Sequence, residues 1–127
     1  MKNTKFYICP VCGNLVEVIE PSGVPLVCCG KPMQELIPGT VEASHEKHIP
    51  VPSVEGRTVK VNVGSVDHPM VAEHYIPWVA LETDQGIHRK HLVPGGAPAV
   101  TFALAEGETP KAVYAWCNLH GLWKAEF

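Results

Sequence analysis

The strongest restriction on the fold of this chain comes from the placement of its cysteines. Four of the five lie in the first 29 residues, and the fifth, Cys117, stands near the other end. A unit this small buries too little apolar surface to fold alone, since below about 40 residues a metal, disulfides or oligomerisation is usually needed. We therefore expect residues 1–36 to form a small domain held together by its cysteines, and residues 37–127 to form a second one. The early cysteines form a Cys-x-x-Cys pair followed by two adjacent residues: Cys9, Cys12, Cys28 and Cys29.

The chemistry of the early cysteines favours a bound metal. A Cys-x-x-Cys turn places two thiolates on one side of an ion, a second pair completes a tetrahedron, and four thiolates suit zinc or iron. From ligand type alone zinc is the commoner occupant, and disulfides are a weaker alternative because cytosolic thiols usually stay reduced. Gly13 and Gly30 follow the two pairs, where tight turns favour positive φ. Cys28 and Cys29 are adjacent, so both reach one ion only through a local distortion of the chain.

The remainder of the chain predicts short strands rather than helices. No stretch shows a helical stripe, whereas Thr58–Val63 (TVKVNV) alternates Val with polar residues as a half-buried strand does. Turn signals rich in Gly, Pro and Asp separate the strand-like runs, and this spacing favours an antiparallel sandwich. In the small domain we expect two short strands on either side of residues 21–25. The expected strands of the second domain are residues 58–63, 76–82, 99–103, 112–117 and 122–127.

All seven histidines lie in the second domain, and one motif stands out among them. An apolar strand ends in Cys117-x-x-His120, which offers a thiolate and an imidazole three residues apart. Imidazole suits iron, copper and zinc, and a buried free cysteine is the alternative interpretation of Cys117. Blue-copper proteins also place Cys and His after a core strand. Their usual axial Met is missing after His120, since Met33 and Met70 lie far away in sequence.

Four short motifs after residue 45 occur in a characteristic order. They are EKHIP at 46–50, HPM at 68–70, HYIPW at 74–78 and CNLHGLW at 117–123. Together with the cysteine cluster, these motifs resemble desulfoferrodoxin, the two-domain superoxide reductase family, over essentially the whole chain. The resemblance implies a mainly β protein, in which a desulforedoxin-like metal knuckle precedes an immunoglobulin-like antiparallel β-sandwich. It also implies iron, rather than zinc, on the four early cysteines.

The same resemblance implies a reaction and a second iron. An oxidoreductase of this kind reduces superoxide by one electron to hydrogen peroxide, as a superoxide detoxification activity. The electron comes from an outside donor such as rubredoxin, with the cysteine-bound iron as a possible relay, and the protein is a homodimer. Glu46 and Lys47 are implied as catalytic residues beside the iron. That iron has four equatorial ligands and one axial ligand, namely His48, His68, His74 and His120 in the plane and Cys117 on the axis.

Charge and hydropathy narrow the remaining choices. The net charge of −3 and the lack of a basic stripe disfavour nucleic acid as a partner. No apolar run approaches the ~20 residues of a membrane span and no secretory signal is recognisable, so we expect a cytoplasmic protein. His45, His88 and His91 match no ligand motif and are interpreted as surface residues. An electron carrier without catalysis and a zinc-bound interaction module stay open as other classes of function.

Overall fold

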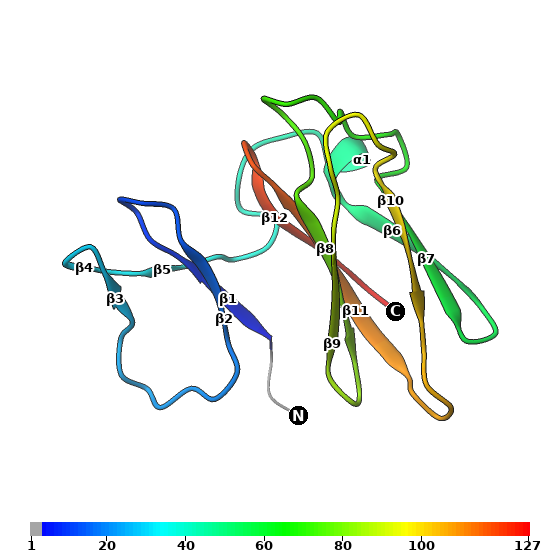
Figure 1. Cartoon of the computed structure of the whole chain (residues 1–127), viewed down its shortest axis with the longest axis horizontal. Helices are drawn as coiled ribbons and strands as arrows, with labels where there is room; N and C mark the ends of the chain where they lie inside the picture. Colours follow the sequence, from blue (N-terminus) through cyan, green and yellow to red (C-terminus); the bar gives the residue numbers. More distant parts are fainter. Residues whose placement is uncertain (1–3) are drawn as a thin grey trace. The chain divides into compact units, whose positions relative to one another are not determined.

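The computed structural model describes residues 4–127 and divides the chain into two compact units, Met1–Ile37 and Pro38–Phe127 (Figure 1). The first unit is built from very short strands and turns. The second is a pair of β-sheets with one helical turn. The helix of the described residues, α1, has four residues, far fewer than a bilayer-crossing helix requires.

The first unit has a small sheet and a separate hairpin. The sheet has the order β2-β1-β5, with β1 (Lys5–Ile8) antiparallel to both β2 (Leu15–Val18) and β5 (Gln34–Glu35). A hairpin of β3 (Val27–Cys28) and β4 (Lys31–Pro32) carries the second cysteine pair. The strands expected around residues 21–25 are therefore confirmed as β2 and β3.

The apolar interior of the first unit is thin. Phe6 and Cys9 are buried, whereas Ile19 is 77% exposed and Val24 is 75% exposed. Burial of apolar area stabilises a fold by roughly 25 cal/mol per Å², so two buried side chains contribute little against the entropy of ordering the chain. This composition agrees with a unit whose stability depends on what its cysteines bind.

The second unit is a sandwich of two antiparallel sheets, as expected for an immunoglobulin-like fold. One sheet has the order β10-β7-β6 and the other has the order β12-β11-β8-β9 (Figure 1). A helical turn, α1, precedes the first strand. The elements are α1 (His45–His48), β6 (Pro50–Glu55), β7 (Thr58–Val63), β8 (Trp78–Thr83), β9 (Ile87–His91), β10 (Ala99–Ala103), β11 (Pro110–Cys117) and β12 (Gly121–Glu126).

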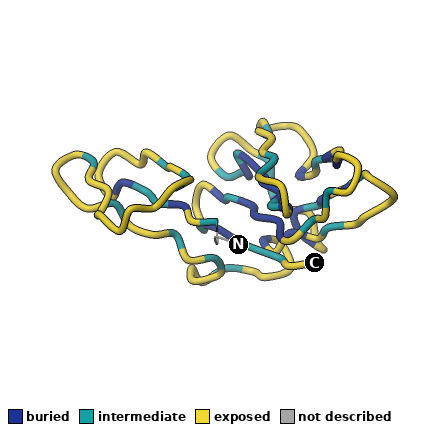
Figure 2. Tube along the Cα trace, turned by 90° about the horizontal axis from the view of Figure 1, so that it is seen from below, coloured by how far each residue is buried: buried dark blue, intermediate teal, exposed yellow. Residues whose placement is uncertain are grey.

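The core of the sandwich follows from alternation along the strands. On β7, Val59, Val61 and Val63 are fully buried while Lys60 is exposed, because successive side chains point to opposite faces. In Figure 2 the buried positions of this unit lie in its interior and the exposed ones on its outside. Cys117 is the last residue of β11 and is completely buried in this core. The remaining core residues are Ile76, Val79, Leu81, Phe102, Leu104, Val113 and Ala115.

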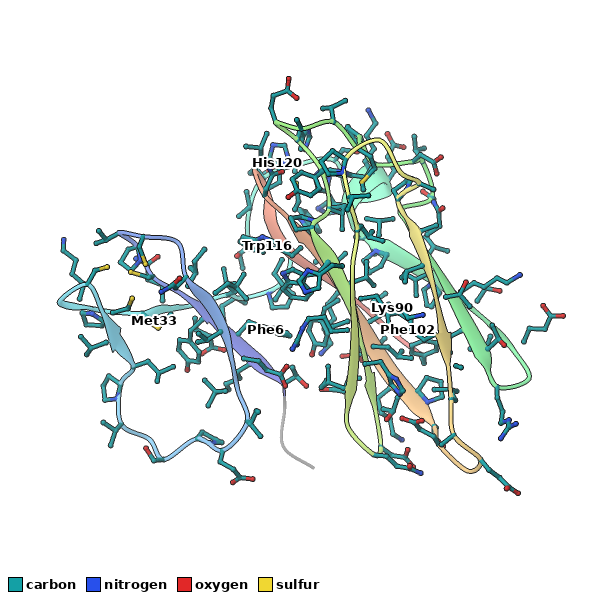
Figure 3. All side chains as sticks on the ribbon, in the orientation of Figure 1. Phe6, Met33, Lys90, Phe102, Trp116 and His120 are labelled. Atoms are coloured by element: carbon teal, nitrogen blue, oxygen red, sulfur yellow. The ribbon has the colours of Figure 1, made fainter. Side chains whose placement is uncertain are left out.

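In the second unit, two strands and the helical turn were not expected from the sequence. Pro50 and Pro52 argue against a strand, yet β6 tolerates them because it is an edge strand of its sheet. The polar strand β9 is also at an edge, where Lys90 donates to the Thr101 carbonyl and lies 5.6 Å from the centre of the Phe102 ring (Figure 3). These contacts join β9 to β10, which belong to different sheets.

The three histidines interpreted as surface residues all have accessible side chains, but the third is partly covered. His45 and His91 are exposed. His88 is half-buried, and its Nε2 lies 2.9 Å from Glu108 Oε2. Alternation explains the difference, since His88 pairs with the core residue Leu81 and therefore points inward.

Candidate metal centres

The four early cysteines meet at one point of the first unit. Their sulfur atoms all lie within 4.8 Å of one another, and all are free thiols. The Sγ atoms of Cys12 and Cys28 are 3.6 Å apart, and those of Cys28 and Cys29 are 4.0 Å apart. The backbone N–H groups of Val11 and Cys12 both donate to Cys9 Sγ at 3.4 Å, the arrangement of a metal-binding knuckle. A disulfide framework is therefore excluded in this structure, and four converging sulfurs fit a tetrahedral ion.

The local distortion expected at the adjacent cysteines is present. Cys29 has φ of 54°, in the left-handed region that residues other than glycine rarely adopt. This turn brings its side chain back toward that of Cys28. Gly13 and Gly30 have φ of 80° and 72°, which confirms the expected positive φ after each cysteine pair. The backbone is thus bent at each cysteine pair so that the thiols face inward.

The acidities of these thiols show how strongly they interact. The N–H groups of Cys12 and Val11 hold the pKa of Cys9 down at about 6, with the nearby thiols adding to the effect. The pKa values of Cys28 and Cys29 shift the other way, because hydrogen bonds with neighbouring thiols raise both, that of Cys29 to about 12. Ionisation of the Cys9 thiol therefore makes ionisation of Cys28 and Cys29 less favourable. A cation that accepts all four thiolates removes this conflict, as expected for a metal-binding group.

The second group of donors lies at one end of the sandwich. It is assembled from α1, from the long connection between β7 and β8, and from the turn between β11 and β12. These segments gather at the upper end of the sandwich in Figure 1, and Figure 3 labels His120 there. The five residues predicted as ligands of the second iron all meet here: His48, His68, His74, Cys117 and His120.

The four imidazoles are arranged around a square. His48 and His68 have ring centres 4.6 Å apart, as do His68 and His74, and the planes of each pair are almost perpendicular. His120 is 5.0 Å from both His74 and His48, again with steep angles. His48 and His74 face each other across the square at 6.4 Å, with their planes inclined by 30°.

The cysteine thiol completes the group. Cys117 Sγ lies 3.4 Å from His68 Nε2 and 3.8 Å from His120 Nδ1. A square of nitrogens with one sulfur beside it offers five donors. Imidazole and thiolate both suit iron, so this donor set fits an iron ion.

Backbone carbonyls select the tautomers of two imidazoles. His48 Nδ1 is 2.6 Å from the Ser44 carbonyl, and His68 Nδ1 is 2.7 Å from the Pro69 carbonyl. A carbonyl only accepts, so each Nδ1 carries the proton and each Nε2 presents a lone pair. These two Nε2 atoms face each other at 3.2 Å, an unfavourable approach unless a cation lies between the donors. His74 adds an observation of the same kind, because its Nε2 is buried and has no hydrogen-bond partner among residues 4–127.

Burial keeps the group neutral. Desolvation lowers the pKa of His68 to about 4 and also lowers the pKa of His48 and of His74. These three imidazoles are therefore unprotonated and able to bind a metal at neutral pH. Burial raises the pKa of the Cys117 thiol, so its deprotonation has to accompany metal binding.

Asn118 joins two of the ligand-bearing segments. Its side-chain nitrogen donates to the Glu73 carbonyl at 3.0 Å, and its oxygen accepts from the Tyr75 N–H at 3.0 Å. The Asn118 N–H also donates to the Tyr75 carbonyl. The His74 segment is thereby tied to the turn that carries Cys117 and His120. Asn118 lies inside a motif noted in the sequence, but no pattern there indicated what its amide contacts.

Glu46 and Lys47 are exposed residues of α1 that directly precede His48 in the chain. The charge of Lys47 helps to lower the pKa of both His48 and His74, after the larger effect of burial. Glu46 precedes it and is also exposed. His74 and His120 are half-buried, whereas His48 and His68 are buried.

A blue-copper arrangement is not formed. Met70 Sδ accepts the Ile76 N–H at 3.5 Å, and Met70 packs against the sandwich core. A blue-copper site needs two His, one Cys and a weak axial ligand, whereas four imidazoles converge here. The sequence expectation that Met70 is not an axial ligand agrees with this contact.

Comparison with known proteins gives one consistent result. The protein-family model described as desulfoferrodoxin matches residues 40–126, and the model of the desulfoferrodoxin N-terminal domain matches residues 2–36. A desulfoferrodoxin of Syntrophotalea carbinolica is 47% identical over 120 residues, which cover 94% of each chain.

Solved structures agree with the sequence comparisons. The superoxide reductase of Treponema pallidum has 43% sequence identity and a TM-score of 0.83, covering 98% of this chain and all of its own. A one-iron superoxide reductase of Giardia intestinalis has 29% identity and a TM-score of 0.56. It covers 65% of this chain and 97% of its own.

Proposed function

This chain belongs to the desulfoferrodoxin family, and from that premise we propose that it reduces superoxide to hydrogen peroxide at the histidine–cysteine group. The observation that carries the proposal is the square of four imidazoles beside one fully buried thiol. These five residues would hold an iron ion, and five protein donors would leave room on it for one small ligand. A bound metal with a position for substrate differs in this way from a closed structural site.

We assign two irons to the chain, each with its own ligands. Iron bound in the histidine–cysteine group supplies the one-electron reducing chemistry. The Giardia protein, which is named a one-iron enzyme, matches 65% of this chain, and this supports placing superoxide chemistry in the second unit. The ligands of the catalytic iron are His48, His68, His74, His120 and Cys117, and those of the other iron are Cys9, Cys12, Cys28 and Cys29.

The protein prepares these ligands in two ways. The Ser44 and Pro69 carbonyls fix the protons of His48 and His68 on Nδ1, so that both Nε2 atoms point at the metal position. Cys117 contributes a thiolate from the interior of the sandwich, where water cannot form hydrogen bonds to its sulfur. A thiolate donates more electron density than an imidazole, and this favours electron transfer to a bound ligand.

Lys47 and Glu46 act at the entrance to the group. The Lys47 ammonium attracts the superoxide anion and orients the water that delivers protons to the product. Its influence on the pKa of His74 supports this position. Glu46 supplies a carboxylate that can occupy the substrate position between turnovers.

The complete reaction consumes one superoxide, one electron and two protons and gives one hydrogen peroxide. A reductase of this kind releases no O₂, unlike a dismutase. The electron comes from an external donor protein such as rubredoxin. It passes either through the cysteine-bound iron or directly to the histidine–cysteine group. The proposal also includes a homodimer, which the family resemblance implies, and a cytoplasmic location, as expected from the sequence.

One experiment tests this function directly. Purified iron-loaded protein is mixed with a measured pulse of superoxide and a defined reductant, while peroxide and O₂ are followed together. We expect one peroxide per superoxide and no O₂ above the uncatalysed background. Release of one O₂ for every two superoxides would identify a dismutase and reject the proposal. Metal analysis of the same sample should find about two irons per chain and no copper, one for each donor group.

A further inference from the structure

A glycine is required at position 64 because there is no space for a side chain, and not because the residue has a positive φ. Most glycines of this chain have positive φ, but Gly64 and Gly96 do not. A Cβ on Gly64 would lie 2.6 Å from the Glu46 carbonyl oxygen and 2.8 Å from that of Ile49. It would also lie 3.1 Å from the carbonyl carbon of Lys47. The backbone of α1 therefore rests directly on Gly64, and no side chain fits between them.

Two hydrogen bonds fasten this contact. The Val66 N–H donates to the Glu46 carbonyl at 2.9 Å, and the Ser65 hydroxyl donates to the same oxygen at 3.2 Å. The Glu46 carbonyl thus has two donors from consecutive residues. Two hydrogen bonds to one oxygen stabilise the contact and also fix the direction of the carbonyl.

The same turn leads into His68. The His68 N–H donates to the Val63 carbonyl at 2.7 Å, and Asn62 bonds both the Gly64 carbonyl and the Asp67 carboxylate. One rigid turn therefore sets the position of His68 and supports the backbone that carries His48. The Nε2 atoms of these two histidines, 20 residues apart in sequence, meet at 3.2 Å.

We propose that Gly64, Ser65 and Val66 form a positioning turn that fixes the Glu46–Lys47 backbone, and with it His48, relative to His68. The inference rests on the proposed function only for what Lys47 does to superoxide. The positioning turn touches neither substrate nor iron and acts through the residues it holds. A displacement of about 1 Å at reacting groups lowers rates by about 100-fold. The positioning turn therefore affects the reaction rate through the backbone of Lys47 and His48.

The test is Gly64→Ala, with Gly96→Ala as its matched control. Gly96 also lacks positive φ, and its Cβ would meet its nearest atom, the Val93 carbonyl oxygen, at 3.3 Å. In Gly64→Ala we expect iron of the histidine–cysteine group to pass to a chelator about 10-fold to 100-fold more readily. We expect the superoxide rate constant to fall by about 10-fold and its ionic-strength dependence to weaken. Gly96→Ala should match the wild type in each measurement.

A double variant shows whether the positioning turn acts through Lys47. If it does, Gly64→Ala combined with Lys47→Ala loses less superoxide rate than the product of the two single losses. Multiplying losses would overturn the link to Lys47. A folded Gly64→Ala protein with wild-type iron retention and wild-type rate would overturn the positioning turn itself. Iron retention needs no superoxide, so it judges the turn even if the wild type proves inactive as a reductase.

Hydrogen exchange on the wild type covers the case in which Gly64→Ala does not fold. The Val66 amide should exchange at least about 10-fold more slowly than an unprotected amide, because its proton is bonded to the Glu46 carbonyl. Exchange at the unprotected rate would overturn the proposal without any variant. Ser65→Ala should raise this exchange rate by about 3-fold to 10-fold through loss of the second donor, and no change would count against the turn.

Discussion

The two units of this protein reach a metal-binding arrangement by opposite routes. In the first unit all four donors come from one stretch of 21 residues, Cys9 to Cys29, on a thin apolar interior. In the second, five donors come from three segments between His48 and His120 and rest on a complete sandwich core. The comparison shows two relations between metal and fold. The first unit depends on its metal for stability, whereas the second binds a metal on a sandwich that its own core stabilises.

Metal removal should separate the units most sharply. When both irons are chelated under reducing conditions, we expect the first unit to lose its structure, because metal binding supplies about 10 kcal/mol to sites of this kind. The sandwich should stay folded, since its core is independent of the ion. Residue-resolved hydrogen exchange checks this, with fast exchange in residues 4–37 and protection in β7, β8 and β11. Loss of protection in both units together would break the comparison.

Replacing one thiol in each unit sharpens the same contrast. Cys117→Ser should abolish superoxide reduction, by about 1,000-fold or more, and leave one iron per chain in the cysteine group. Cys12→Ser is the matched control and should lose the other iron, with the histidine–cysteine iron retained. Iron analysis and the visible spectrum of each variant give the result. If either variant lost both irons, the two sites could not be regarded as independent.

Variants of Asn118 test whether the histidine–cysteine group is already formed before the metal binds. Asn118→Ala should weaken iron retention in the histidine–cysteine group by about 10-fold to 100-fold, because the His74 segment is released from the Cys117 turn. Asn118→Asp keeps the acceptor for Tyr75 but sets a carboxylate against the Glu73 carbonyl, so it should resemble the alanine variant. Chelator competition measures both. Wild-type retention in both variants would show that the metal alone holds the segments together.

Lys47→Ala should leave the iron in place and affect capture of the substrate. We expect a second-order rate constant about 10-fold lower and a weaker dependence on ionic strength, because steering by an exposed charge is screened by salt. Lys47→Arg, which keeps the charge, is the control and should retain most of the salt dependence. Pulse-generated superoxide at several salt concentrations provides the measurement. An unchanged rate in the alanine variant would remove Lys47 from the mechanism.

The smallest effect concerns a part of the sandwich that no metal reaches. Hydrogen bonds from Thr83, from the Ala105 N–H and from His88 lower the pKa of Glu108 from 4.5 to about 2. Because the folded-state pKa is depressed, this contribution is present above about pH 4.5 and is lost as the pH falls toward 2. Glu108→Gln should therefore lower the melting temperature of the metal-free sandwich at pH 7, and the gap should close in acid. A gap that widened in acid would contradict this sign.

Much of this protein could be predicted from short-range patterns. The Cys-x-x-Cys spacing, the positive φ after Cys12 and Cys29, and the alternation of β7 depend on neighbouring residues alone. The gathering of the predicted donors was anticipated from their motifs and the family resemblance, and their role as ligands is still to be tested. Strands β6 and β9 escaped detection because edge positions tolerate proline and charge, which elsewhere argue against a strand.

The sequence by itself determined the order of the donors, the two-unit division of chemistry and the β character of the chain, because these follow from residue types at short spacing. Only the tertiary structure decided which atoms face one another across long separations. The amide of Asn118 between two segments and the bare backbone contact at Gly64 both depend on that packing. The physical reason is that such contacts arise from strand register and loop packing, which no local pattern encodes.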